Sequence, residues 1–128
     1  AEVTVLALGT DLSYAHEGYD AVNISMPDAQ LALVASAAAA SSKPLVVVFF
    51  GSTPLDISPL LDNDKVGAIV HVGQPSVQLG GVAAVLYGAK VPAGRVVQTF
   101  LPTEYMNMIS IFDFNMRPGP SAWPRPDC

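Results

Sequence analysis

The chain has 128 residues, 51% of them hydrophobic, and a formal net charge of -5 from eleven acidic and six basic side chains. A chain of this length supports one domain with a buried core. The acidic balance gives no basic surface for phosphate or anionic lipid, so neither nucleic acid nor a membrane surface is an expected partner. Apolar runs are broken, notably at Lys43 and Pro44, before they reach the ~18 residues of a membrane span.

Three short segments rich in β-branched residues predict strands at residues 3–8, 45–50 and 66–72. Their hydrophobicity is nearly continuous, which is typical of strands buried on both faces of a parallel sheet. Between the first two, apolar residues recur at helical spacing over residues 28–41, and Pro27 suits a first helical turn. This alternation of strand and helix predicts an α/β fold.

The second half of the chain continues the pattern less clearly. A turn at residues 63–65 precedes the third strand, and Ser76 is expected to cap a helix that ends at Gly88. Its inner face is expected to carry four apolar residues: Val77, Val82, Val85 and Leu86. Residues 95–100 predict a fourth strand. Four prolines after residue 116 predict an extended surface tail, because proline lacks the amide hydrogen of a regular helix or central strand.

Residues 66–99 follow the order strand, glycine-rich turn, helix and second turn, and the motif Pro54-Leu55-Asp56-Ile57-Ser58 precedes them. This pattern resembles the C-terminal α/β sandwich domain of glycoside hydrolase family 3, most closely the β-xylosidase branch. The resemblance implies a three-layer sandwich with a mostly parallel sheet over residues 1–116, followed by a Pro-rich tail at residues 117–128. The family domain runs further than this chain, so a partial domain is expected.

The loop at residues 9–20 is the first candidate site, because loops at the carboxyl ends of parallel strands line the ligand crevice. Glycoside cleavage needs a carboxylic acid that protonates the leaving oxygen, and Glu17 is the candidate. Asp11 and His16 are candidate substrate-binding residues. The alternative is that the acids of this loop are ordinary solvated side chains, with Asp20 holding nearby backbone amides. The resembled family has Glu-Ala-Glu-Gly here; this chain has Ala15 at the first glutamate, so Glu17 matches the second.

Two further turns offer polar groups. Residues 51–58 resemble a family turn that shapes the domain, in which Asp56 is expected to hold the backbone. After the third strand, Gln74 is a candidate for binding sugar hydroxyls, while Ser76 is expected to cap a helix. His71 and Trp123 are interpreted as packed residues, His71 with one nitrogen hydrogen-bonded.

No cofactor is expected, and two histidines with one terminal cysteine lack the spacing of a metal site. Cys128 is either an unpaired thiol or half of a disulfide with a residue outside the chain. The triplet Asn23-Ile24-Ser25 matches the N-glycosylation pattern. Glycosylation at Asn23 is therefore expected if the protein is secreted, and an extracellular location is the expectation that the resemblance implies.

The resemblance implies a domain of a β-xylosidase-like glycosidase that completes a sugar cleft with an N-terminal barrel of the same parent protein. Its ligand would be a β-linked sugar or xylo-oligosaccharide. The family's nucleophile is a barrel aspartate, so the chain alone is not expected to be active. The alternative is an inactive structural or recognition module with a protein partner in an extracellular assembly, which Ala15 and Ser76 favour. A third alternative is a nucleotide-binding protein of the flavodoxin type. It would need a glycine-rich phosphate-binding loop after the first strand, and Gly9-Thr10-Asp11 is too acidic for that.

Overall fold

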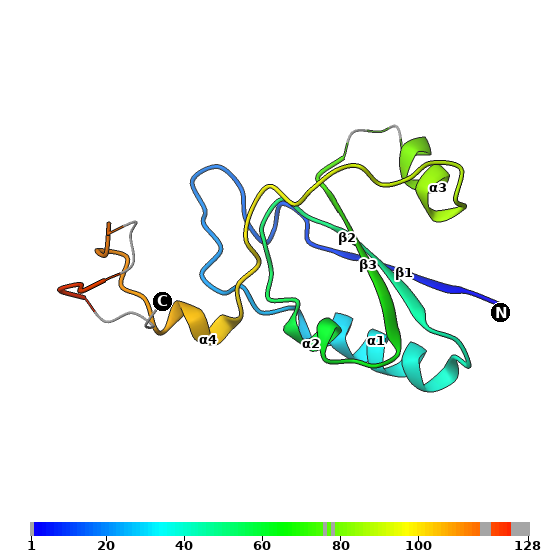
Figure 1. The fold of residues 1–128 in the computed structure, drawn as a ribbon, viewed down its shortest axis with the longest axis horizontal. Coiled ribbons are helices and arrows are strands. Elements are labelled where there is room, and N and C mark those ends of the chain that lie inside the picture. The colour runs from blue at the N-terminus through cyan, green and yellow to red at the C-terminus, as the bar shows by residue number, and fades with distance from the viewer. Residues whose placement is uncertain (1, 76, 78, 116–118, 124–128) are drawn as a thin grey trace.

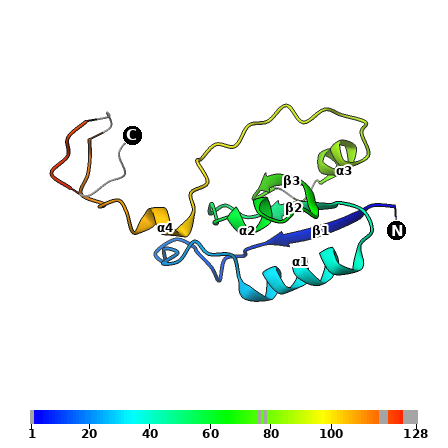
Figure 2. The same ribbon diagram turned by 60° about the horizontal axis from the view of Figure 1, so that its bottom comes forward.

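The computed structural model describes residues 2–75, 77, 79–115 and 119–123. A parallel sheet in the order β1-β2-β3 is built from β1 (Thr4–Gly9), β2 (Leu45–Phe50) and β3 (Val66–Gly73). The helices are α1 (Asp28–Ala40), α2 (Ser58–Leu61), α3 (Gly80–Leu86) and α4 (Thr103–Met106). In Figure 2, α1 and α3 lie on opposite sides of the sheet. The predicted α/β sandwich with a parallel sheet is confirmed.

Helix α1 makes the crossover between β1 and β2, as predicted, and begins directly after Pro27. Val34 and Ala38 are buried, four residues apart, because residues at this spacing share one face of a helix. The core that α1 covers consists of Leu8, Met26, Val34, Val47, Phe49, Leu55 and Leu60. Strands β1 and β2 and the segments that enter α1 and α2 therefore meet in one apolar cluster (Figure 1).

Burial on both faces is observed for β2 alone. Val47 and Phe49 are buried on the core side, and Val48, which points to the other face, is buried as well. In β1 the outward residues Val5 and Ala7 are exposed. The expectation of three doubly buried strands is therefore wrong for the outer two, because α3 contributes no buried residue to the second face.

Helix α3 is shorter than predicted. It begins at Gly80, after Leu79 as N-cap, and Val77 is almost fully exposed rather than part of an inner face. Ser76, the predicted cap, lies outside the described residues. The predicted end is confirmed: Gly88 has a φ of +73°, and its amide donates to the carbonyl of Val85. A left-handed residue directly after a helix is the arrangement for which glycine is favoured.

Residues 88–102, called the arm below, connect α3 to α4 and cross over the sheet without joining it (Figure 2). The predicted fourth strand at residues 95–100 is therefore wrong. Every arm residue before Phe100 is exposed, and within the described part of the chain residues 91–99 make no backbone hydrogen bond to the sheet. Apolar sequence alone does not make a strand: β1 and β3 both have a free edge, but this segment pairs with neither.

The predicted boundary between residues 1–116 and a tail at 117–128 stays a prediction, since positions 116–118 and 124–128 lie outside the described residues. Cys128 belongs to that part. Trp123 packs against Phe112, with ring centroids 5.5 Å apart, although both remain largely exposed.

A small residue is required where β1 ends. A Cβ added at Gly9 would lie 2.0 Å from the carbonyl oxygen of Phe50 on β2. We expect Gly9→Ala to lower the free energy of unfolding by about 1–3 kcal/mol, because the strands must separate locally. Urea unfolding followed by circular dichroism measures this. The matched control is Gly81→Ala in α3, where the added methyl meets open space and helix propensity favours alanine. Equal stability of the two variants would contradict the steric argument.

Candidate functional site

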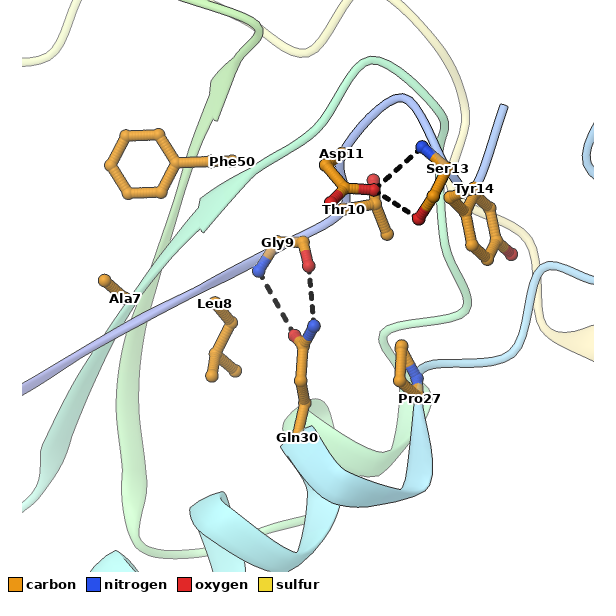
Figure 3. Close-up of a pocket in the computed structure, with 10 residues that line it drawn as sticks. All are labelled: Ala7, Leu8, Gly9, Thr10, Asp11, Ser13, Tyr14, Pro27, Gln30 and Phe50. Carbon is orange, nitrogen blue, oxygen red and sulfur yellow. Dashed lines mark hydrogen bonds between the residues drawn. The ribbon is translucent and has the colours of Figure 1, made fainter. Parts of the chain in front are cut away.

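A hollow of about 530 Å³ lies at the carboxyl end of β1, where the sequence predicts a site. Its walls come from the end of β1, the loop that follows, the start of α1 and the end of β2 (Figure 3). The lining residues are Ala7, Leu8, Gly9, Thr10, Asp11, Ser13, Tyr14, Pro27, Gln30 and Phe50. A concave site with a few polar groups among apolar ones is the usual form of a small-molecule site.

Gln30 fixes the floor of this hollow. Its side-chain Oε1 accepts from the amide of Gly9 at 3.1 Å, and its Nε2 donates to the carbonyl of the same residue at 2.6 Å (Figure 3). On the other side, the amide of Thr10 donates to the carbonyl of Phe50 at 2.9 Å. Because β1 is an edge strand, Gln30 takes the place of a missing neighbour strand at this residue. The Gln30–Gly9 hydrogen bonds and the Thr10–Phe50 hydrogen bond together fix the point at which the loop leaves the sheet.

Asp11 lines the hollow as an anion. Its Oδ1 accepts from the hydroxyl of Ser13 at 2.5 Å and from the amide of Ser13 at 2.8 Å. These bonds, the hydroxyl bond first, lower the pKa of Asp11 although it is fully exposed. A carboxylate held in its charged form accepts hydrogen bonds from hydroxyl groups and does not act as a proton donor.

Glu17 lies at the tip of a tight turn. His16 and Tyr19 exchange backbone hydrogen bonds of 3.0 and 2.9 Å, their rings stack at 5.3 Å, and Gly18 has a φ of +80°. The Nδ1 of His16 is 2.9 Å from the carbonyl oxygen of Leu12. Thus the loop is internally braced, and it presents the Glu17 side chain to solvent.

The predicted site residues are not gathered in one place. Asp11 lines the hollow, whereas His16, Glu17 and Gln74 do not. All four are exposed, Gln74 in the turn after β3. Sequence reasoning missed Tyr14 and Gln30, because a glutamine two residues into a helix gives no signal that it will bond a strand 21 residues away.

Asn23, the predicted glycosylation acceptor, is exposed. Its Oδ1 accepts from the amide of Ser25 at 2.8 Å, and its carbonyl oxygen accepts from the hydroxyl of Tyr14. The side chain is therefore accessible, and its modification stays a prediction. Within the part of the chain that the structure describes, no group of three or more His, Cys, Asp or Glu side chains is arranged to hold a metal ion.

Asp56 joins three segments beside this site, and its expected role of holding the backbone is confirmed. Oδ1 accepts from the amide of Ser58 at 2.9 Å; Oδ2 accepts from the amide and the hydroxyl of Thr103 at 2.8 and 2.9 Å. The amide of Asp56 donates to the carbonyl of Ile24 at 2.7 Å. The end of the candidate loop, the turn after β2 and the start of α4 thereby meet at one carboxylate. We call Asp56 with these partners the carboxylate node.

Ser25 completes the carboxylate node. Its Oγ is 3.2 Å from Oγ1 of Thr103. Because Thr103 uses its one hydroxyl hydrogen for Asp56, the hydrogen between the two hydroxyls belongs to Ser25. Burial alone would raise the pKa of Asp56, but the hydrogen bonds from Ser58 and Thr103 outweigh it and lower the pKa to about 2.

The chain matches the glycosyl hydrolase family 3 C-terminal domain over residues 1–119. It belongs to that family. A probable exo-1,4-β-xylosidase of Neosartorya fischeri is 41% identical over 121 residues, and the probable β-D-xylosidase 7 of Arabidopsis thaliana is 36% identical over 119 residues. These alignments cover 93% and 91% of this chain and 15% of each relative.

The fold is also found in a solved family 3 exo-β-xylosidase, in complex with a xylobiose aziridine activity-based probe. The match has a TM-score of 0.80 and 38% identity, and it covers 93% of this chain and 16% of that protein. This chain therefore corresponds to about a sixth of the length of the family 3 xylosidases that it resembles. The predicted family and fold are confirmed.

The carboxylate node leads to a prediction for stability. Asp56→Asn keeps the shape of the side chain but places an amide group where Asp56 accepts three hydrogen bonds, so we expect a loss of about 2 kcal/mol. The pKa of Asp56 is about 2 in the fold and 3.8 in an ordinary aspartate. The stabilisation is therefore complete above pH 4 and is lost as the pH falls toward 2.

Urea unfolding at several pH values measures both effects. Asp64→Asn, an exposed acid in the turn before β3, is the control and should stay near the unmodified protein. If Asp56→Asn is as stable as that control at pH 7, the carboxylate node does not stabilise the fold.

Proposed function

We propose that this chain serves a β-xylosidase-like glycosidase as its C-terminal sandwich domain and completes a cleft for β-linked xylo-oligosaccharides. One observation carries the proposal: 93% of the chain superposes, at 38% identity, on an exo-β-xylosidase bound to a xylobiose-derived probe. The chain spans about 15% of its curated relatives. The remaining parts of the reaction, the nucleophilic aspartate above all, belong in this proposal to a barrel domain of the parent protein.

The hollow at the end of β1 supports this division of labour. It offers the Asp11 carboxylate and the hydroxyl of Thr10 beside apolar side chains, which suits the hydroxyls and the ring carbons of a sugar. It is a shallow half-site, and a barrel facing it would close the cleft. His16 and Gln74, exposed on neighbouring loops, are proposed to meet the sugar from its edges.

We propose Glu17 as the acid that protonates the leaving oxygen. It is exposed at the tip of a turn that internal hydrogen bonds hold in place, so it extends away from the sandwich toward a facing domain. Contact with that domain would take Glu17 out of water and place its carboxyl group within reach of the leaving oxygen.

The extracellular location remains part of the proposal. The described residues hold no helix long and apolar enough to cross a bilayer. Asn23 is exposed on a loop, where a secretory route would allow a glycan to be attached.

A second candidate function is favoured by one residue. Ala15 stands where the resembled family motif has its first glutamate. If that glutamate is the acid, the parent protein is inactive, and the domain acts as a structural or recognition module in an assembly.

The proposal predicts how Glu17→Gln changes hydrolysis by the parent protein. We expect kcat/KM for xylobiose to fall about 100-fold or more, because its leaving sugar must be protonated. For 4-nitrophenyl β-xyloside, kcat/KM should change little, since nitrophenolate leaves without a proton. Steady-state kinetics with both substrates measures this difference.

Asp20→Asn, an exposed acid of the same loop, is the matched control and should retain activity on both substrates. An unchanged kcat/KM for xylobiose in Glu17→Gln would remove Glu17 from the mechanism. If the unmodified parent hydrolyses neither substrate, the function as a module replaces that of a glycosidase.

A further inference from the structure

His71, near the carboxyl end of β3, lies between two phenylalanine rings. It stacks on Phe49 of β2 at a centroid distance of 5.7 Å and an interplanar angle of 16°, and it forms a T-shaped pair with Phe100 of the arm at 5.1 Å and 74°. Phe49 and His71 are register partners on neighbouring parallel strands, so their rings lie on the same face of the sheet. Phe100 thereby extends a ring cluster that begins in the core.

Phe100 is where the arm meets the sheet. All residues from 88 to 99 are exposed, whereas Phe100 is half-buried and the carboxylate node follows at Thr103. Among the described residues, hydrogen bonds of Thr103 with Asp56 and Ser25 hold this part of the chain, together with the aromatic contact at His71. A T-shaped ring pair changes the ratio of docked to released arm by a few-fold.

The burial of one ring nitrogen favours an uncharged imidazole in the docked state. The Nε2 atom of His71 is buried and has no hydrogen-bond partner among the residues that the structure describes. A proton there would place an unpaired N–H, with positive charge on the ring, against Phe49 and Phe100. Burial of the ring accordingly lowers the pKa of His71 below the ordinary 6.5.

The charged groups on the surrounding elements do not supply a partner for that proton. β2 has no ionisable side chain, and neither do the described residues of the turn after β3. The charged residues of the arm and of α4 nearest to Phe100 in sequence are Arg95 and Glu104. Asp56, after β2, is occupied by Ser58 and Thr103. Histidine is the side chain that ordinarily changes charge between pH 5 and 8.

We propose that His71 is an acid-sensitive latch, which holds Phe100 and the arm against the sheet when neutral and releases them when protonated. The contact is complete above pH 6.5, where His71 is neutral with the arm docked or released. As the pH falls below that value, His71 takes up its proton more readily when the arm is released than when it is docked, so the equilibrium shifts toward release. The carboxylate node keeps its charge over this range because the pKa of Asp56 is about 2. Only the aromatic contact opens.

Fluorine NMR tests the latch on the intact protein labelled with 4-fluorophenylalanine. The Phe100 resonance is assigned from its loss in Phe100→Leu, and its shift between H₂O and D₂O reports exposure to water. Phe114, 82% exposed, gives the reference for a solvated ring. Between pH 7 and pH 5 we expect Phe100 to move toward the Phe114 value, with the released-to-docked ratio rising by up to about tenfold per pH unit, the limit for one proton.

Two variants make the assignment specific. His71→Phe keeps an aromatic ring at the position but has no ionisable group, so Phe100 should remain docked, and half-buried, throughout the pH range. His16→Phe changes the protein's other histidine, which lies on the loop after β1, and should behave as the unmodified protein does. The latch is overturned if Phe100 shows no pH dependence, if the dependence persists in His71→Phe, or if far-UV circular dichroism shows that the whole fold is lost at pH 5.

Discussion

The buried carboxylate of Asp56 is the interaction on which the arrangement of the loops depends. Three parallel strands and one helix are a small core, and much of the remaining chain consists of loops and of an arm with little contact to the sheet. Charge-assisted hydrogen bonds to an ionised carboxylate are roughly twice as strong as neutral ones. By accepting from Ser58 and from both donors of Thr103, Asp56 joins a turn to a residue 47 positions away.

This linkage bears on the candidate site because the loop that carries Glu17 ends at the same place. The carbonyl of Ile24 accepts from the amide of Asp56, and Ser25 donates to Thr103. The start of the same loop is set at Gly9 by Gln30 and by β2. The loop is thus held at both ends and braced at its tip, which suits a segment that must present a side chain to a separate domain.

Much of this fold follows from local patterns. The continuous apolar strands, the helix after Pro27 and the glycine that ends α3 are each specified within a few residues, and the structure confirms them. The strand predicted at residues 95–100 was wrong because a strand must pair with the edge of a sheet, and no local pattern reveals that this segment pairs with neither free edge. The partner of Asp56 could not be predicted either, because it is distant in the sequence. The Asp-x-Ser pattern predicts the bond to Ser58, but nothing in the sequence points to Thr103. The candidate loop follows β1 as predicted, but the sequence did not indicate that Asp11 would line the hollow while Glu17 would not.

A double-mutant cycle between Asp56 and Thr103 tests the central claim most directly. The free energies of unfolding of Asp56→Ala, Thr103→Ala and the double variant are compared with that of the unmodified protein at pH 7. We predict a coupling of about 1–3 kcal/mol from the hydrogen bond between the Thr103 hydroxyl and the buried charge of Asp56, which Thr103→Ala removes while the hydrogen bond from the backbone amide of residue 103 stays. Additive effects, with a coupling below about 0.3 kcal/mol, together with an Asp56→Ala variant as stable as the unmodified protein, would show that the carboxylate does not hold the chain together at this point.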